Sequence, residues 1–164
     1  MPSELSFIPI EQVVPIPAFK VLPGEIAFVS GHRFPMLRAE TSNSTAIFVD
    51  LGGGNFMQIS DVNNQDETSF VIADWRLEID PTSLNEGKYQ SYVFGQAYSM
   101  NGSFGLFALR QGQYSRPHVL AISTDGTEAP TEHDSARLFF SKWRIVSGPT
   151  DAPIVWAESA DVAA

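Results

Sequence analysis

The sequence has no cysteine among its 164 residues. Disulfide bonds, thiolate metal sites, iron–sulfur clusters and cysteine nucleophiles are therefore excluded. Histidine is scarce as well, because His32, His118 and His133 are the only three and form neither an H-x-H nor an HExxH pattern. A zinc site or a cupin-like site needs imidazoles clustered with carboxylates at set spacings. The sequence therefore predicts neither a metal nor a cofactor.

Basic residues are also few. The chain has 10 Lys and Arg against 19 Asp and Glu, a net charge of −9, and no run of basic residues. Nucleic acid and anionic membranes are themselves negative, so neither is expected as a partner. No apolar run approaches the roughly 20 residues of a membrane-spanning helix. The N-terminus shows no secretory signal. We expect a soluble protein of the cytoplasm or of a virion, and a mature chain with its leader removed remains an alternative.

Helical periodicity is missing too. Instead, short apolar runs alternate with turns rich in Gly, Pro, Asn and Ser, at the spacing of roughly 8–12 residues that is typical of β-sandwiches and barrels. The predicted strands lie at residues 25–30, 36–41, 45–51, 55–60, 68–80, 118–123, 136–146 and 154–157, together with a hairpin at 92–111. Residues 68–80 are predicted to form one long strand or two, with an apolar face made of Val71, Ala73, Trp75, Leu77 and Ile79, and a bulge is predicted near Ser141. The sequence therefore predicts an all-β protein, an antiparallel sandwich or jelly-roll-like fold of about ten short strands.

The hairpin at residues 92–111 is the strongest local signal. Asn101-Gly102 joins two apolar runs, and both turn positions of such a hairpin need positive φ. This turn places Tyr98 opposite Gly105 and Phe94 opposite Leu109. A large aromatic ring protects a bare cross-strand glycine, and glycine allows another backbone to approach closely. Both faces of the hairpin are apolar, so we expect it to lie centrally in one sheet and to be covered.

Residues 1–24 differ from the rest, and the sequence predicts three parts: an extended arm at 1–24, one sandwich domain at 25–158 and a tail at 159–164. Five prolines block a helix in the arm, yet it is too apolar for a solvated linker. It either wraps its own domain as an edge strand or docks on a neighbouring subunit. The residues expected at such an interface are Phe7, Ile8, Ile10, Val13, Val14, Ile16 and Phe19.

Two weaker patterns concern ligands. Tyr114, Arg116 and His118 combine an aromatic ring with hydrogen-bonding groups in a predicted loop, which suits a sugar. Three carboxylates on one predicted strand face, Asp74, Glu78 and Asp80, are spaced as a glycoside hydrolase needs, with His118 or His133 as further candidates. The simpler interpretation of the carboxylates is a solvent-facing stripe.

These features favour a non-enzymatic structural or assembly subunit, resembling virion coat or decoration proteins only in architecture. Its expected partner is itself, as a homo-oligomer, or another structural protein. The alternative is a lectin-like carbohydrate-binding module that uses Tyr114, Arg116 and His118 to bind a glycan. A hydrolase on a β-scaffold is the third hypothesis.

Overall fold

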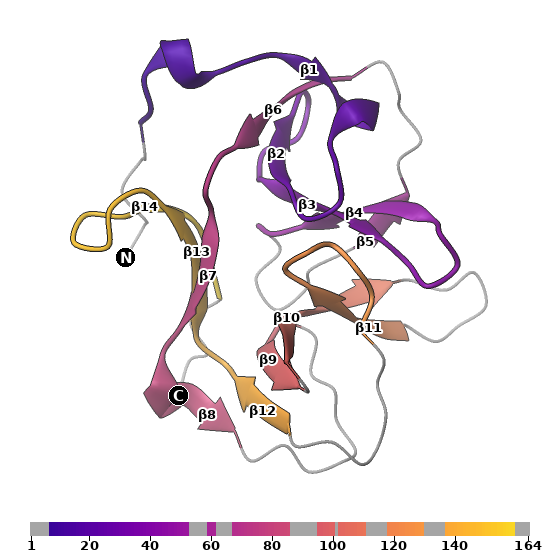
Figure 1. The fold of residues 1–164 in the computed structure, drawn as a ribbon, viewed down its shortest axis with the longest axis vertical. Helices are drawn as coiled ribbons and strands as arrows, with labels where there is room; N and C mark the ends of the chain where they lie inside the picture. The colour runs from indigo at the N-terminus through magenta and orange to yellow at the C-terminus, as the bar shows by residue number, and fades with distance from the viewer. Residues whose placement is uncertain are drawn as a thin grey trace.

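The computed structural model describes residues 7–52, 59–61, 67–85, 95–100, 102–110, 118–129 and 137–159. Within these ranges the protein is all-β, and its only helical segments are three 3-10 turns, η1 (Ile10–Gln12), η2 (Ala18–Lys20) and η3 (Pro81–Ser83). None of the described helical segments has the length and apolarity to cross a membrane. The strands form three antiparallel sheets in a sandwich-like arrangement, which confirms the predicted fold class (Figure 1).

The described strands divide as follows. Sheet A has the order β1 (Ile16–Pro17), β6 (Thr68–Ile72), β2 (Ile26–Val29), β3 (Met36–Glu40), β4 (Ala46–Asp50) and β5 (Ile59–Asp61). Sheet B has the order β11 (His118–Ser123), β10 (Ser103–Arg110), β9 (Ala97–Met100), β12 (Arg137–Phe140) and β8 (Leu84–Asn85). Sheet C has the order β14 (Ile154–Glu158), β13 (Trp143–Ser147) and β7 (Arg76–Ile79).

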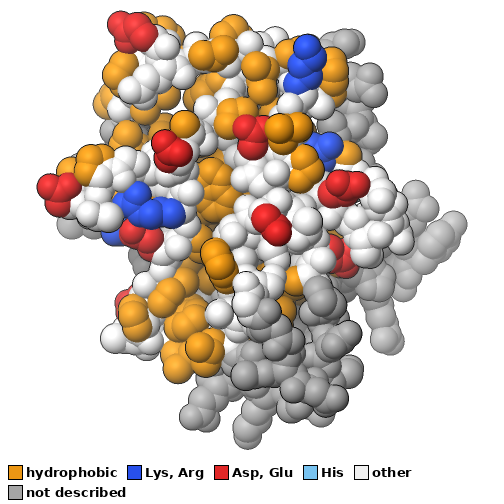
Figure 2. All heavy atoms as spheres, viewed as in Figure 1, with side chains coloured by type: hydrophobic (Ala, Val, Ile, Leu, Met, Phe, Trp, Pro, Cys, Tyr) orange, Lys and Arg blue, Asp and Glu red, His pale blue; other side chains and the backbone are white. Residues whose placement is uncertain are grey.

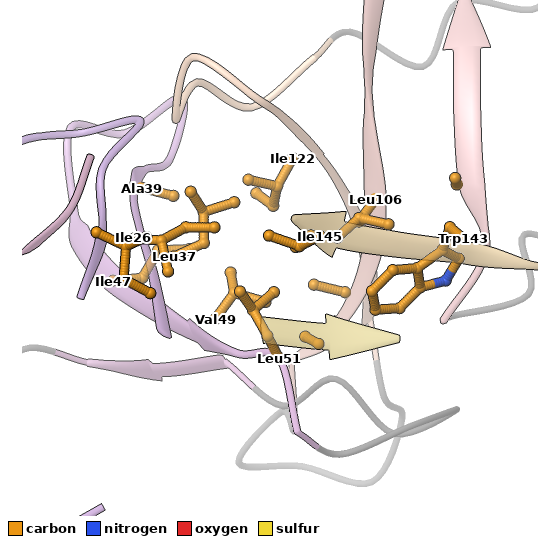
Figure 3. Close-up of a cluster of buried hydrophobic side chains, with 14 residues drawn as sticks. Ile26, Leu37, Ala39, Ile47, Val49, Leu51, Leu106, Ile122, Trp143 and Ile145 are labelled. Atoms are coloured by element: carbon orange, nitrogen blue, oxygen red, sulfur yellow. The ribbon is translucent and has the colours of Figure 1, made fainter. Parts of the chain in front are cut away.

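One hydrophobic core joins the three sheets (Figure 3). Ile26, Leu37 and Val49 enter it from sheet A, Leu106 and Ile122 from sheet B, and Trp143 and Ile145 from sheet C. All seven side chains are buried. Since each strand is too short to make a core alone, burial of these branched and aromatic side chains supplies the main stabilisation of the fold.

Two predicted long strands each divide between two sheets. Residues 68–80 form β6 and β7, separated by a turn in which Asp74 has φ +53°. This turn swaps the faces, so Ile72 in β6 and Leu77 in β7 both contact the core although they differ in parity. Of the two alternatives for residues 68–80, one strand or two, the structure has two, and the single apolar face predicted from Val71 to Ile79 does not continue through the turn. Residues 137–147 divide in the same way at Ser141, near the predicted bulge, into β12 and β13.

The central hairpin forms as predicted around Gly102. Tyr98 pairs with Gly105, and β9 and β10 lie in the middle of sheet B. Ala97 and Leu106 face the core, whereas Tyr98 and Phe107 belong to a second buried cluster on the opposite face. Both faces of the hairpin thus contribute buried side chains, as expected, but Phe104 at the start of β10 is 55% exposed. Phe94, predicted to lie opposite Leu109, is outside the described residues.

Candidate functional site

The N-terminal arm runs along the top of the molecule and across sheet A (Figure 1). Prolines keep it extended: Pro9 and Pro17 have φ −60° and −61° with ψ 136° and 140°. Ile16 pairs with Ser69, which makes β1 the edge strand of the sheet. An edge is where a strand containing proline fits, because Pro17 cannot donate to a further neighbour. The arm therefore follows a defined path on its own chain.

The inner side of the arm is part of the domain's packing. Ala18 and Val21 are buried against Val29, Met36 and Phe48, on the face of sheet A that points away from the core. Ile16 also packs partly against this cluster, which we call the arm cluster. The arm thus explains why β2, β3 and β4 are apolar on both faces.

Besides the pairing of β1 with β6, three hydrogen bonds fix the backbone of arm residues 16–21 to the domain. Ala18 N–H donates to the Glu67 carbonyl oxygen at 2.8 Å. Ser69 Oγ donates to the Ile16 carbonyl oxygen at 3.1 Å, and Arg38 Nε donates to that of Val21 at 3.2 Å. These bonds satisfy polar backbone groups beside buried apolar side chains, where an unpaired group would be costly.

The outer side of the arm carries large apolar side chains that face solvent. Five of these side chains have exposed fractions between 50% and 82%: Phe7, Ile10, Val14, Phe19 and Leu22. We call these five residues the outer arm face. Between residues 7 and 22 the only charges are Glu11 and Lys20, which cancel. Figure 2 shows hydrophobic side chains along the top edge of the molecule, with few charged ones among them. The outer arm face is therefore a neutral apolar strip on an acidic protein.

A second exposed apolar set lies on sheet B. Phe104 and Leu138 both pair with Ser99, from opposite sides, so their side chains share one face of the sheet. Both are about half exposed, as is Leu84 on β8. We call Leu84, Phe104 and Leu138 the sheet B patch. It is smaller than the outer arm face and comes from three strands.

The candidate carboxylates are already engaged. Glu78 Oε2 accepts from Arg76 Nε at 2.9 Å, and Glu78 Oε1 accepts from Arg144 at 2.8 Å. Hydrogen bonds from Arg76 and then Arg144 lower the pKa of Glu78. A general acid needs a raised pKa, so Glu78 is poorly suited to protonate a leaving group.

Asp80 has a structural role. Its Oδ1 accepts hydrogen bonds from the Thr82 N–H at 2.9 Å and the Thr82 hydroxyl at 2.7 Å, which caps η3. These bonds lower the pKa of Asp80. Asp74 lies apart from both, at the turn between β6 and β7. The three carboxylates therefore do not form the acid–base pair that the hydrolase hypothesis requires.

One protein family, described as Uncharacterised protein y4lG, matches this chain over residues 27–163. The chain belongs to this family. No curated protein and no solved structure matches it. The match to the y4lG family begins inside β2 and spans the three sheets, but it leaves out the arm. The outer arm face therefore lies outside the part of the chain that the family match covers.

The structure of this y4lG member describes only one of the three residues of the predicted sugar site. Tyr114 and Arg116 lie outside the described residues, and His118 is the first residue of β11, where it pairs with Arg110. His133 also lies outside them. Within the described part of the chain, no three His, Asp or Glu side chains gather as a metal site would require. The arm is thus the predicted feature that the structure describes best.

The sequence identified the arm but not its two sides. Ile16 points inward to the arm cluster, while Phe7, Ile10, Val14 and Phe19 point outward. Leu22, exposed beside the buried Val21, was missed. The sequence did contain a signal for the inner side of the arm. Ala18 is a small residue between Pro17 and the bulky Phe19, and only a small residue fits against a closely packed sheet face.

Replacing Glu78 with glutamine should lower the free energy of unfolding at pH 7 by about 0.5–1 kcal/mol, because partly exposed ion pairs contribute little. The arginines lower the pKa of folded Glu78, so their stabilisation is present above its ordinary value of 4.5 and is lost as pH falls through the folded value. The difference between parent and variant should therefore shrink as the pH falls below 4.5. Urea unfolding at several pH values measures it.

The control is Asp151→Asn, which removes a carboxylate from an exposed position in the β13–β14 connection. It should change stability little at any pH. A Glu78→Gln difference that stays constant from neutral to acidic pH would contradict the role assigned to the two arginines.

Proposed function

We propose that this chain is a non-enzymatic structural subunit that assembles with copies of itself, or with another structural protein, through the outer arm face. The observation that supports this most is the exposure of five large apolar side chains on one short segment, Phe7, Ile10, Val14, Phe19 and Leu22. Large exposed apolar surface marks interaction sites in soluble proteins.

The way the arm is held also favours assembly. Residues 16–21 are anchored by the arm cluster and by three backbone hydrogen bonds, so this part of the surface is preformed. A partner that binds there loses less conformational entropy than one that must first order a free tail. The outer arm face is also neutral, so two acidic copies can meet there without direct repulsion between like charges.

In its architecture, the proposed subunit resembles virion coat or decoration proteins. The net charge of −9 is unsuited to a surface that faces a packaged genome and suits an exterior or accessory position. This comparison concerns architecture alone, namely an antiparallel β domain with an extended apolar arm.

The test is a triple variant, Phe7→Ser with Ile10→Ser and Val14→Ser. These side chains are exposed, so the fold should remain intact. The parent should have a mass of two or more chains by light scattering at micromolar concentration. The variant should shift to a single chain, with a dissociation constant raised about 1,000-fold if the three contacts together contribute about 4 kcal/mol.

The matched control replaces the sheet B patch with Leu84→Ser, Phe104→Ser and Leu138→Ser. It replaces the same number of exposed apolar side chains elsewhere, although each of these three is less exposed than Phe7, Ile10 or Val14. Its mass should equal that of the parent. The proposal fails if the parent is a single chain throughout the concentration range, or if only the control variant dissociates.

A further inference from the structure

A groove of about 780 Å³ lies where the arm, sheet A and sheet C meet. Ile8 and Gln12 of the arm form one wall. β6 with its following turn, Arg76 of β7, and the β13–β14 connection form the others. This volume is within the range of small-molecule sites, roughly 300–1,000 Å³. The groove is separate from both the outer arm face and the loop in which a sugar site was predicted.

Two positioned aromatic rings line the groove, Phe70 and Trp156. Phe70 stacks on Phe28, with ring centroids 5.3 Å apart and 24° between planes. Phe28 in turn meets Trp156 edge-on at 5.7 Å. Trp156 is also held by a hydrogen bond from its Nε1 to Ser147 Oγ at 2.7 Å. Both rings are partly exposed, so they offer fixed apolar surface to a ligand.

Two charged side chains line the groove, and one is a hydrogen-bond donor while the other is an acceptor. Arg76 donates through Nε to Glu78 and through Nη1 to the Gly148 carbonyl oxygen at 2.7 Å, but its Nη2 is buried and finds no hydrogen-bond partner among the residues that the structure describes. A buried donor without a partner is unfavourable, so Arg76 favours a ligand that carries a hydrogen-bond acceptor. Asp74 is exposed on the groove and only accepts when ionised.

This combination discriminates between classes of ligand. Asp74 disfavours an anion, and Arg76 disfavours a cation. A hydrocarbon would offer no hydrogen bond to Asp74 or to Arg76 Nη2. A neutral ring with several hydroxyl groups satisfies both, because each hydroxyl donates and accepts. Its C–H face also suits an aromatic surface.

We propose that this groove binds a neutral saccharide, with one sugar face against Trp156 or Phe70 and its hydroxyl groups on Asp74 and Arg76. The competing occupant is the arm of a second copy. It fits less well, because Pro9, Pro15 and Pro17 have no N–H to offer Asp74. This inference is independent of the assembly proposal and makes no use of the outer arm face.

The test titrates the full chain with neutral hexasaccharides: maltohexaose, cellohexaose, laminarihexaose, mannohexaose and chitohexaose. At least one should change tryptophan fluorescence, with a dissociation constant below about 1 mM by calorimetry. Asp74→Asn should weaken binding about 10-fold or more, the effect of losing a hydrogen bond to a charged group. Asparagine tolerates the positive φ of this turn, so the variant should fold. Trp156→Phe should weaken binding as well.

The matched control is Asp151→Asn, an identical charge change at an exposed position outside the groove lining. It should bind the hexasaccharide as the parent does. Three results would overturn the inference: no binding to any of the five sugars, equal binding by the parent and both groove variants, or displacement of the sugar by a synthetic peptide of residues 7–22. The last result would assign the groove to the arm of a second copy.

Discussion

Replacing Gly105 with alanine is expected to lower the free energy of unfolding by about 3–5 kcal/mol, the cost of an overpacked site together with one or two lost ladder hydrogen bonds. A Cβ atom at this position would lie 1.9 Å from the Ile122 carbonyl oxygen and 2.7 Å from Ser123 Cα. Both atoms belong to the backbone of β11, so no side-chain rotation can relieve the clash. β10 and β11 would have to separate.

The side chain of Tyr98 increases this effect. Tyr98, Gly105 and Ser123 form one row across β9, β10 and β11. The Tyr98 hydroxyl reaches over the bare glycine to Ser123 Oγ at 3.1 Å. Burial raises the pKa of Tyr98, so the hydroxyl remains neutral and depends on this hydrogen bond. A movement of β11 would therefore also disturb a buried polar contact.

Urea unfolding followed by circular dichroism measures the loss. The matched control is Gly102→Ala in the same hairpin, where a Cβ would meet nothing within 4 Å but the backbone φ is +78°. This variant should cost only about 1–2 kcal/mol, the strain of a left-handed conformation. If Gly105→Ala lowers the free energy of unfolding no more than Gly102→Ala does, the result contradicts the close approach of the β10 and β11 backbones.

The hairpin also shows what the sequence could predict. Its turn depends on two adjacent residues, Asn101 and Gly102, and alternation of side chains then sets the register of Tyr98 against Gly105. Such information is local. The protection of Gly105 by an aromatic ring followed from the same register. The close approach of β11 was anticipated only as a general use of glycine, because its partner Ser123 lies further along the chain.

The division of strands between sheets could not be predicted in the same way. Asp74 adopts φ +53°, which is uncommon for a residue other than glycine, and nothing beside it in the sequence signals a turn. The groove was missed for a related reason. Gln12, the stretch from Asp74 to Arg76, and Trp156 are far apart in sequence and come together only through the pairing of β13 with both β7 and β14 and through the path of the arm. Such contacts depend on tertiary structure.

The two sides of the arm lead to the second large expected effect. A chain that lacks residues 1–22 should lose about 4–6 kcal/mol of stability, which is comparable to the whole stability of a marginal domain. Buried Val21 and Ala18 would leave the arm cluster and expose Met36 and Phe48 to water. The carbonyl and N–H groups that the arm now pairs would also lose their partners.

A chain that lacks only residues 1–14 is the matched control, because it retains β1 and the arm cluster and removes no fully buried residue of the described arm. Measured where both are single chains, its stability should lie within about 1 kcal/mol of the parent, as for other surface changes. It should nevertheless lose assembly, since Phe7, Ile10 and Val14 are gone. In the parent, assembly should make the melting temperature rise with protein concentration, and in this shorter chain that dependence should disappear. Equal stability of the parent and the chain without residues 1–22 would contradict the anchoring of the arm, and unchanged assembly of the chain without residues 1–14 would contradict the interface.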